Sequence, residues 1–402
     1  MWLSYCWLHP GSPHYRKEGI LRVLHVHSGN LYGGVETILV TLARHRDLCP
    51  QMESHFALCF EGRLKEELTV AGAPVYQLGK VRLRQVVSVL RARRTLRELV
   101  DKNDFDLGVC HSSWSRAIFG PVLRLAGLPL VSWFHESKTD KNWLDRWSDR
   151  TPTDLAICNS EFTASALRNR YAGVRSEVVY FPVANDHTFS DADRRAIRTE
   201  LHTPEAATVI VQASRMEPWK GHALNLEALH LLKDLPGWIC WLAGGGQRPP
   251  ETEYLEELKS LAGRLGIADR VRFLGERSDV AMLLRASDVY CQPNIEPEPF
   301  GIVFIEALYA RLPVVTTAFG GACEIVNGSC GILVPPGDRM ALASSLRLLI
   351  QNSSLRKRLG AEAPEHAQKL CDPLTQMHRI AEVLVHVASD AGSDLRTTVI
   401  PT

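Results

Sequence analysis

The sequence predicts an α/β protein in which two Rossmann-like lobes face each other across a cleft. Its 402 residues exceed what one ordinary α/β core supports. From Leu21 onward, short apolar runs rich in Val, Ile and Leu alternate with helical patterns, which is typical of parallel β/α layers. This alternation is interrupted by prolines and aspartates between Phe181 and Glu205 and then restarts, so the boundary between the lobes is expected there.

The alternation places the individual elements. In the first half, strands are expected near residues 21–27, 54–59, 106–110, 130–134, 153–157 and 177–180. In the second half, they are expected near residues 207–213, 238–243, 271–273, 288–292, 313–316 and 331–334. Helices fill the gaps, and a final helix is expected over roughly 373–389. The predicted division is an N-terminal extension (1–19), two lobes (20–185 and 186–372) and a C-terminal segment (373–402) whose helix could pack back on the first lobe.

Composition excludes several classes of protein. The 46 basic and 45 acidic residues give a net charge of +1, which offers no general attraction for nucleic acid. The ten cysteines include no C-x-x-C pair and are interpreted as reduced core thiols, which indicates a cytoplasmic protein. No apolar run reaches the ~18 residues that a membrane helix needs, and residues 1–19 do not have the pattern of a leader peptide.

The most informative stretch is Glu296-Pro-Glu-Pro-Phe-Gly-Ile-Val-Phe-Ile-Glu306, which follows a predicted strand. Its prolines prevent a helix at first, and Gly301 then allows the backbone to approach a ligand closely before a helix begins. The free amides at this helix start suit a phosphate. Glu298 and Glu306 are eight positions apart and are interpreted as binding opposite ends of one long ligand; the alternative is two solvated carboxylates.

A second candidate site is Ser214-Arg-Met-Glu-Pro-Trp-Lys-Gly-His222, after the strand that ends at Ala213. Arg215 and Lys220 bracket a tight loop, and two fixed cations can compensate for the desolvation of a diphosphate. An Arg-x4-Lys pair alone is more often surface charge, so the prediction depends on its position at a strand end.

Two candidates lie in the first half. Gly33 and Gly34 stand between a strand and a helix, where main-chain amides can reach an anion; a plain tight turn explains them equally well. His135 ends another strand, where it could lie against a bound sugar or be structural. His25 and His27 are interpreted as strand residues, and no metal site is predicted. Gly244–Gly246 is expected to form the floor of a nucleotide cleft.

The stretch 80–102 contains eight basic and two acidic residues. Its apolar positions, which include Val86, Val89, Leu90, Leu96 and Val100, predict a solvated helix packed by its apolar side. The alternative is a basic surface that rests on anionic lipid or on a phosphorylated acceptor.

Together these motifs resemble the family-four retaining glycosyltransferases, also called glycosyl transferases group 1, which have the GT-B fold. The resemblance extends from about Leu21 to Pro336, and its most specific part is Glu298-Pro-Phe-Gly-x4-Glu306 with Arg215-x4-Lys220 upstream. The donor-binding residues that it implies are Gly33, Gly34, Arg215, Lys220, Glu298, Phe300, Gly301, Ile302, Val303 and Glu306. Those that it implies for catalysis are Glu298, His135, Arg215 and Lys220. The bulky Pro218-Trp219 inside the loop is a departure.

The resemblance also implies the reaction. A UDP- or GDP-linked sugar would be transferred to a hydroxyl of a glycan or lipid-linked acceptor, with retention of configuration and without a metal or other cofactor. The 20–185 lobe would face the acceptor and the 186–372 lobe would hold the donor. Such an enzyme is expected in the cytoplasm or at the inner face of the membrane, in surface-glycan assembly. Two alternatives remain at this point, a nucleotide-sugar epimerase of the same architecture and a non-catalytic nucleotide-sugar binding protein.

Overall fold

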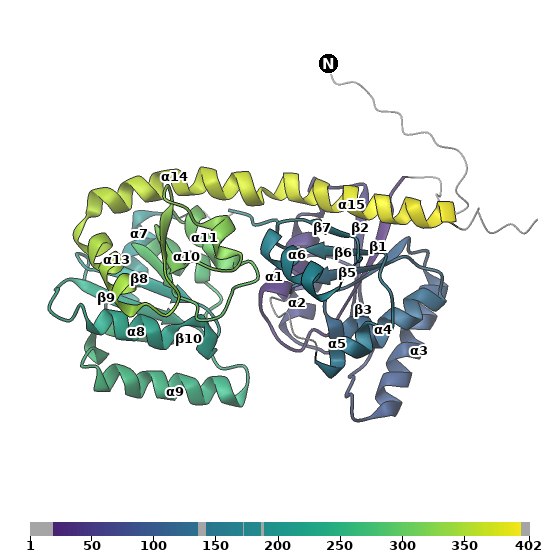
Figure 1. Cartoon of the computed structure of the whole chain (residues 1–402), viewed down its shortest axis with the longest axis horizontal. Coiled ribbons are helices and arrows are strands. Elements are labelled where there is room, and N and C mark those ends of the chain that lie inside the picture. Colours follow the sequence, from purple (N-terminus) through teal and green to yellow (C-terminus); the bar gives the residue numbers. More distant parts are fainter. Residues whose placement is uncertain (1–18, 136–141, 172, 186–188, 395–402) are drawn as a thin grey trace, which may run out of the picture.

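The computed structural model describes residues 19–135, 142–171, 173–185 and 189–394. Within them the chain forms two parallel sheets, each flanked by helices, which confirms the predicted two-lobed α/β architecture (Figure 1). The predicted N-terminal extension lies, except for residue 19, outside the described residues.

The first sheet has seven strands in the order β3-β2-β1-β4-β5-β6-β7. Its strands are β1 (Leu21–His27), β2 (Met52–Leu58), β3 (Val75–Gln77), β4 (Leu107–Cys110), β5 (Leu130–Phe134), β6 (Leu155–Cys158) and β7 (Ser176–Val178). Its helices are α1 (Gly34–Arg44), α2 (Arg63–Val70), α3 (Val86–Lys102), α4 (Ser113–Leu125), α5 (Trp143–Ser148) and α6 (Glu161–Arg170), with the 3₁₀ helix η1 (Arg46–Leu48). The central strands are almost continuously buried, as strands covered on both faces must be.

The second sheet has six strands in the order β10-β9-β8-β11-β12-β13. Its strands are β8 (Thr208–Ala213), β9 (Trp238–Ala243), β10 (Val271–Gly275), β11 (Val289–Gln292), β12 (Val314–Thr317) and β13 (Gly331–Val334). Its helices are α7 (Asp191–Glu200), α8 (His222–His230), α9 (Pro249–Arg264), α10 (Val280–Ala286), α11 (Ile302–Tyr309), α12 (Ala322–Ile325), α13 (Arg339–Gln351) and α14 (Ser353–Cys371), with the 3₁₀ helices η2 (Pro218–Lys220) and η3 (Ala268–Arg270).

Local sequence explains where several helices begin. Ser112, Ser160 and Ser190 each accept a hydrogen bond from the backbone amide three residues later, and the residue at that position bonds back to the serine amide. These capping boxes satisfy amides that the first helical turn leaves free.

The last helix, α15 (Pro373–Asp394), lies on the first lobe although it follows the second. The ring Nε2 of His378 is 3.0 Å from the carbonyl oxygen of Leu48, and Arg379 forms an ion pair with Glu177 at 2.9 Å. Figure 1 shows α14 and α15 end to end along one edge of the molecule. The apolar core is likewise continuous between the lobes, where the rings of Phe181 and Phe300 meet edge to face at 5.3 Å.

Apart from shifts of a few residues in strand bounds, the structure differs from the sequence predictions at three places. Strand β3 was not expected, because its three residues are only half-buried and form no apolar run. Helix α7 was not expected either, since its apolar content is low; it is anchored by Arg198, whose buried guanidinium bonds Asp288 at 2.7 Å. The apolar pattern of α3 predicted that Val86 and Leu90 pack against the lobe. This prediction was wrong, because their side chains are 67% and 57% exposed.

Candidate functional site

The predicted site residues lie at the points where strand order reverses in the two sheets. In the first sheet β1 adjoins both β2 and β4, and in the second β8 adjoins both β9 and β11. Gly33 follows β1, Arg215 follows β8 and Glu298 follows β11. Ligands of parallel α/β sheets bind at such points, beyond the carboxyl ends of the strands.

The glycine loop, residues Gly33 and Gly34, faces the second lobe. Gly33 is the N-cap of α1 and Gly34 its first residue. A Cβ atom added at Gly34 would lie 3.6 Å from Cδ1 of Ile302, the first residue of α11. The starts of two helices, one from each lobe, are therefore close together, and each presents free backbone amides. Such a pair of positive helix ends suits a ligand with two phosphates.

The start of α11 requires a glycine. Gly301 is its N-cap with φ +99°, in the left-handed region that side chains disfavour. A Cβ at this position would also lie 2.4 Å from Cδ2 of Phe304 and 3.2 Å from Cγ of Glu298. Phe300 is buried beneath the loop, and the amides of Ile302 and Val303 belong to the first helical turn.

Lys220 and Glu298 form the centre of the site. The Nζ atom of Lys220 is 2.6 Å from Oε2 of Glu298, and both side chains are largely buried. The same carboxylate oxygen accepts hydrogen bonds from Asn294 at 3.1 Å and Gln292 at 3.3 Å. Lys220 also lies 3.8 Å above the ring of Trp219. A buried cation held in this way presents its remaining hydrogens in a fixed direction.

Arg215 lies on the same loop but has a separate set of partners. Its guanidinium is 2.9 Å from Oε2 of Glu217 and 3.8 Å from Oε1 of Glu251. Glu217 Oε1 pairs with Arg248 at 2.7 Å, and Glu217 Oε2 accepts a hydrogen bond from Trp219 Nε1 at 3.1 Å. Arg215 is therefore connected to Lys220 through Glu217 and Trp219 rather than by sharing a partner with it.

Glu306 is half-buried on α11 and accepts no hydrogen bond from the described residues. Burial raises the pKa of its carboxyl to about 7, because the charged form is poorly solvated. A ligand hydroxyl that donates to this carboxylate would stabilise the charged form and lower that pKa.

His135 directly follows β5, and among the described residues neither of its ring nitrogens has a hydrogen-bond partner. Burial is the main cause that lowers its pKa to about 3, and the charge of nearby His27 adds to this, so the ring is neutral at pH 7. It stacks on Phe181 at 5.7 Å, and Phe181 contacts Phe300 of the second lobe. His135 is thus placed near the loop that carries Glu298, with free nitrogens that can bond a sugar hydroxyl.

Sequence reasoning missed two carboxylates, an amide and a further arginine that surround these cations. These residues are Glu217, Gln247, Arg248 and Glu251. Glu217 lies inside the predicted motif and could have been noticed there. The others gave no signal except their nearness to Gly244–Gly246, where added Cβ atoms at Gly244 and Gly246 would lie 1.9 Å from Ser214 O and 2.6 Å from Thr252 N.

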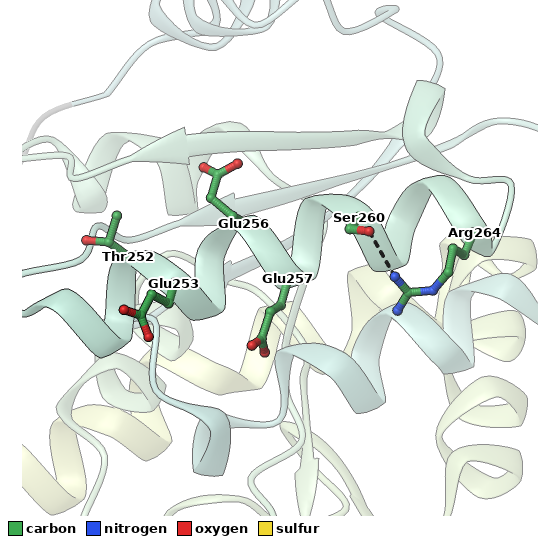
Figure 2. A pocket seen from close by; sticks show the side chains of 6 residues that line it. All are labelled: Thr252, Glu253, Glu256, Glu257, Ser260 and Arg264. Atoms are coloured by element: carbon green, nitrogen blue, oxygen red, sulfur yellow. Dashed lines mark hydrogen bonds between the residues drawn. The ribbon is translucent and has the colours of Figure 1, made fainter.

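A shallow hollow on the surface belongs to α9 alone. Figure 2 shows its side chains along the exposed faces of that helix. Its lining residues are Thr252, Glu253, Glu256, Glu257, Ser260 and Arg264. None of them is a predicted site residue, and three exposed carboxylates do not suit a phosphate.

Within the described ranges, no group of three or more His, Cys, Asp or Glu side chains is arranged to hold a metal ion. No helix in the same ranges is long and apolar enough to cross a bilayer.

Comparisons with known proteins identify the family and the fold. Residues 32–186 match the model of "Glycosyltransferase Family 4", and residues 193–366 match "Glycosyl transferases group 1". A phosphatidyl-myo-inositol mannosyltransferase of Mycobacterium leprae is 33% identical over 285 residues, which cover 67% of this chain and 71% of that protein. A D-inositol 3-phosphate glycosyltransferase of Streptomyces avermitilis is 34% identical over 225 residues, 54% of this chain and 48% of that protein.

Solved structures give the same result. Anabaena Alr3699/HepE in complex with UDP-glucose has a TM-score of 0.80 and 26% identity, and the match covers 91% of this chain and all of that one. WaaG, a glycosyltransferase of lipopolysaccharide biosynthesis, has a TM-score of 0.69 at 18% identity and supports the fold alone. On these matches and on the architecture above, the chain belongs to the family-four glycosyltransferases and has the GT-B fold.

Proposed function

We propose that this glycosyltransferase moves a sugar from a nucleoside-diphosphate-sugar to a hydroxyl of a glycan or lipid-linked acceptor. The observation that carries the proposal is the meeting of Lys220, Glu298 and the start of α11 opposite Gly34. A fixed cation and free helix amides suit the diphosphate, and a buried carboxylate suits sugar hydroxyls. The UDP-glucose complex of the Anabaena protein supports this donor class, and the phosphatidyl-myo-inositol mannosyltransferase supports a lipid-linked acceptor.

In the proposed reaction the sugar retains its anomeric configuration and no metal is required. The bond between the anomeric carbon and the diphosphate oxygen breaks, the acceptor oxygen bonds that carbon on the same face, and the acceptor proton passes to a leaving phosphate oxygen. Lys220 and Arg215 would stabilise the charge that develops on the diphosphate. His135 and Glu298 would bind hydroxyls of the transferred sugar, and Glu306 would bind the ribose.

Binding requires Arg215 to change its interactions. Its guanidinium pairs with Glu217 at 2.9 Å, so a diphosphate must compete with or extend this ion pair. Arg248 would keep the Glu217 charge compensated, because it is 2.7 Å from the other carboxylate oxygen. Arg215 is therefore expected to contribute less to ground-state affinity than Lys220.

Calorimetric titration with UDP, GDP and ADP tests the donor site. We expect UDP to bind, and Lys220→Ala to weaken it by about 10- to 100-fold, since hydrogen bonds to charged groups contribute ~1.5–3 kcal/mol. Arg215→Ala should weaken it less, and Lys357→Ala, which removes an exposed lysine on α14, should have no effect. Unchanged affinity in both site variants would refute the assignment.

Two further measurements test the chemistry. Product formed from an α-linked donor should be α-linked by NMR, and activity should survive EDTA. An inverted product contradicts retention, and lasting inactivation by EDTA contradicts metal independence. A donor incubated without acceptor should at most hydrolyse slowly, whereas an epimerase would convert its sugar.

We further propose that α3 rests on anionic lipid at the inner face of the membrane, where a lipid-linked acceptor would be found. The first turns of α3 and the segment just before it expose apolar side chains beside arginines that have no ion pair in the described structure. This surface consists of Arg82, Arg84, Val86, Val87, Leu90 and Arg91. Arg93 does not belong to it, because its guanidinium bonds the carbonyl oxygens of Ala117 and Ile118. Apolar side chains that insert and arginines that meet headgroups are the two components of interfacial binding.

Liposome flotation tests this contact. Vesicles with phosphatidylglycerol should carry the protein at low salt, and neutral phosphatidylcholine vesicles should not. Leu90→Asp should abolish flotation, whereas Leu348→Asp, at a partly exposed leucine of α13, should not. Absence of the wild type from the anionic vesicles would remove the proposal.

A further inference from the structure

The glycine loop is held from the opposite lobe by one side chain. The amide nitrogen of Tyr32 donates to Oε1 of Gln247 at 3.0 Å, and Nε2 of Gln247 donates to the carbonyl oxygen of Tyr32 at 2.9 Å. The two residues are 215 positions apart and lie in loops of different lobes. A side-chain amide that pairs with both polar groups of one residue fixes its direction as well as its position.

Tyr32 transmits this position to the loop because its own side chain is fixed in the first lobe. Its hydroxyl donates to Glu67 at 3.0 Å, and the guanidinium of Arg63 lies 3.8 Å from the centre of its ring. Gly33 follows directly and is the N-cap of α1. A shift of the Tyr32 main chain would therefore move the amides that begin this helix.

Gln247 is equally well placed on the second lobe. The backbone amide nitrogen of Gln247 donates to Oε2 of Glu251 at 2.7 Å, and Glu251 is buried. The other oxygen of Glu251 accepts from Arg248 at 2.8 Å and lies 3.8 Å from Arg215. The carboxylate of Glu251 therefore holds Gln247 and also lies near Arg215, which is predicted to bind the diphosphate.

We infer that Gln247 is a positioning residue that holds the glycine loop over the diphosphate and couples the loop to Arg215 through Glu251. The inference rests on the proposed function, because it needs a diphosphate between the lobes. It goes beyond that function because Gln247 would not touch the donor. Gln247 would instead determine how tightly the diphosphate is bound by holding the glycine loop.

The test uses the full chain with Gln247→Met, which keeps the length of the side chain but removes both hydrogen bonds. Gln368→Ala, at an exposed glutamine of α14, is the control. Loss of two neutral hydrogen bonds should raise the Kd for UDP by about 5- to 50-fold. The Kd for uridine should change less than twofold, since uridine has no diphosphate for the loop to contact. In the nucleotide-free protein, hydrogen exchange at the amides of residues 33–36 should accelerate in the Met variant and not in the control.

The outcomes separate this inference from the proposed function. Equal losses of affinity for UDP and uridine would overturn the inference, because Gln247 would then be only a structural tie between the lobes. Unchanged exchange at residues 33–36 would overturn it as well, since the loop would be held by other contacts. If the wild type bound no nucleoside diphosphate, the proposed function would fail, whereas faster exchange in the Met variant would still show that Gln247 holds the loop.

Discussion

The two glutamates of the site, Glu298 and Glu306, have carboxylates in very different surroundings. Lys220 and Glu298 are an ion pair, yet the carboxylate also accepts hydrogen bonds from Asn294 and Gln292. Three donors on one buried oxygen hold this carboxylate in place. Glu306 is the opposite case, a half-buried carboxyl without such donors among the described residues, and its pKa is raised to about 7. Two glutamates eight positions apart therefore differ in the hydrogen-bond donors around their carboxylates.

We expect Glu306→Gln to make the free protein more stable above pH 7. Because the pKa of Glu306 is about 7 in the folded chain and 4.5 in the unfolded chain, the folded chain binds more protons between these values. Stability therefore falls as pH rises from 4.5 through 7, and the variant does not share this loss. Urea denaturation at pH 5 and pH 8 should show a smaller decrease in the variant, by on the order of 1–2 kcal/mol.

The same variant separates stability from function. If Glu306 binds the ribose, Glu306→Gln should also weaken UDP binding while the protein gains stability. Glu362→Gln, at an exposed position of α14, should change neither quantity. A pH profile identical to that of the wild type would mean that Glu306 is already ionised and solvated in the free enzyme.

A buried histidine pair joins β1 to the residue that follows β4. Nδ1 of His25 lies 2.9 Å from Nε2 of His111, and both side chains are almost fully buried. Burial is the main cause that lowers the pKa of His25 to about 3 and that of His111 well below its ordinary value. A neutral pair can share one hydrogen in this contact, whereas two charged rings would repel each other.

We expect this pair to make the protein labile in acid. With a pKa of about 3 when folded and 6.5 when unfolded, His25 binds more protons in the unfolded chain between these values. The free energy of unfolding therefore falls as pH decreases through this window, by up to ~3 kcal/mol between pH 7 and pH 4 for His25. His25→Phe should flatten this acid limb in urea denaturation, at some cost at pH 8 for the lost hydrogen bond. His386→Phe, at an exposed histidine of α15, should leave the limb unchanged.

Elements differ in how well the sequence predicts them, for a physical reason. A buried parallel strand needs a continuous apolar run, so β1, β5 and β9 were predicted at the bounds that the structure shows. Helix α7 is stabilised instead by polar contacts with residues about 90 positions away, which no local pattern contains. The burial of Val86 and Leu90 in the first turns of α3 was predicted wrongly, because an apolar residue near a helix end need not face the core.

At the scale of the whole molecule, the individual motifs could be predicted but their contacts could not. The loops that carry Arg215, Lys220 and Glu298 could be found because each follows a strand at the same edge of one sheet. That Arg215 has partners of its own, or that Gln247 reaches Tyr32, depends on side-chain direction and on how the lobes dock. These relations are set by packing between segments far apart in the chain, and the roles assigned to the site residues remain predictions.

The carboxylate of Glu324 also joins the two lobes. Glu324 of α12 accepts hydrogen bonds from the amides of Glu161 at 2.9 Å and Phe162 at 2.8 Å, which begin α6 of the first lobe. The hydroxyl of Tyr180 donates to the same side chain at 3.0 Å. A negative charge at a helix start is stabilising, so the second lobe supplies a cap that α6 uses.

We therefore expect Glu324→Ala to loosen the junction of the lobes as well as lower stability, by about 1–3 kcal/mol, because two helix amides lose their acceptor. Hydrogen exchange should accelerate at the first turn of α6, and small-angle scattering should show a larger radius of gyration. Glu324→Gln keeps one acceptor oxygen without the charge, so its effects should be smaller in each measurement. Tyr180→Phe, which removes only the hydroxyl, should accelerate exchange at α6 little. If Glu324→Ala kept both the exchange rate and the radius of the wild type, the carboxylate would be dispensable, and other contacts such as Phe181 against Phe300 and Gln247 with Tyr32 would hold the junction.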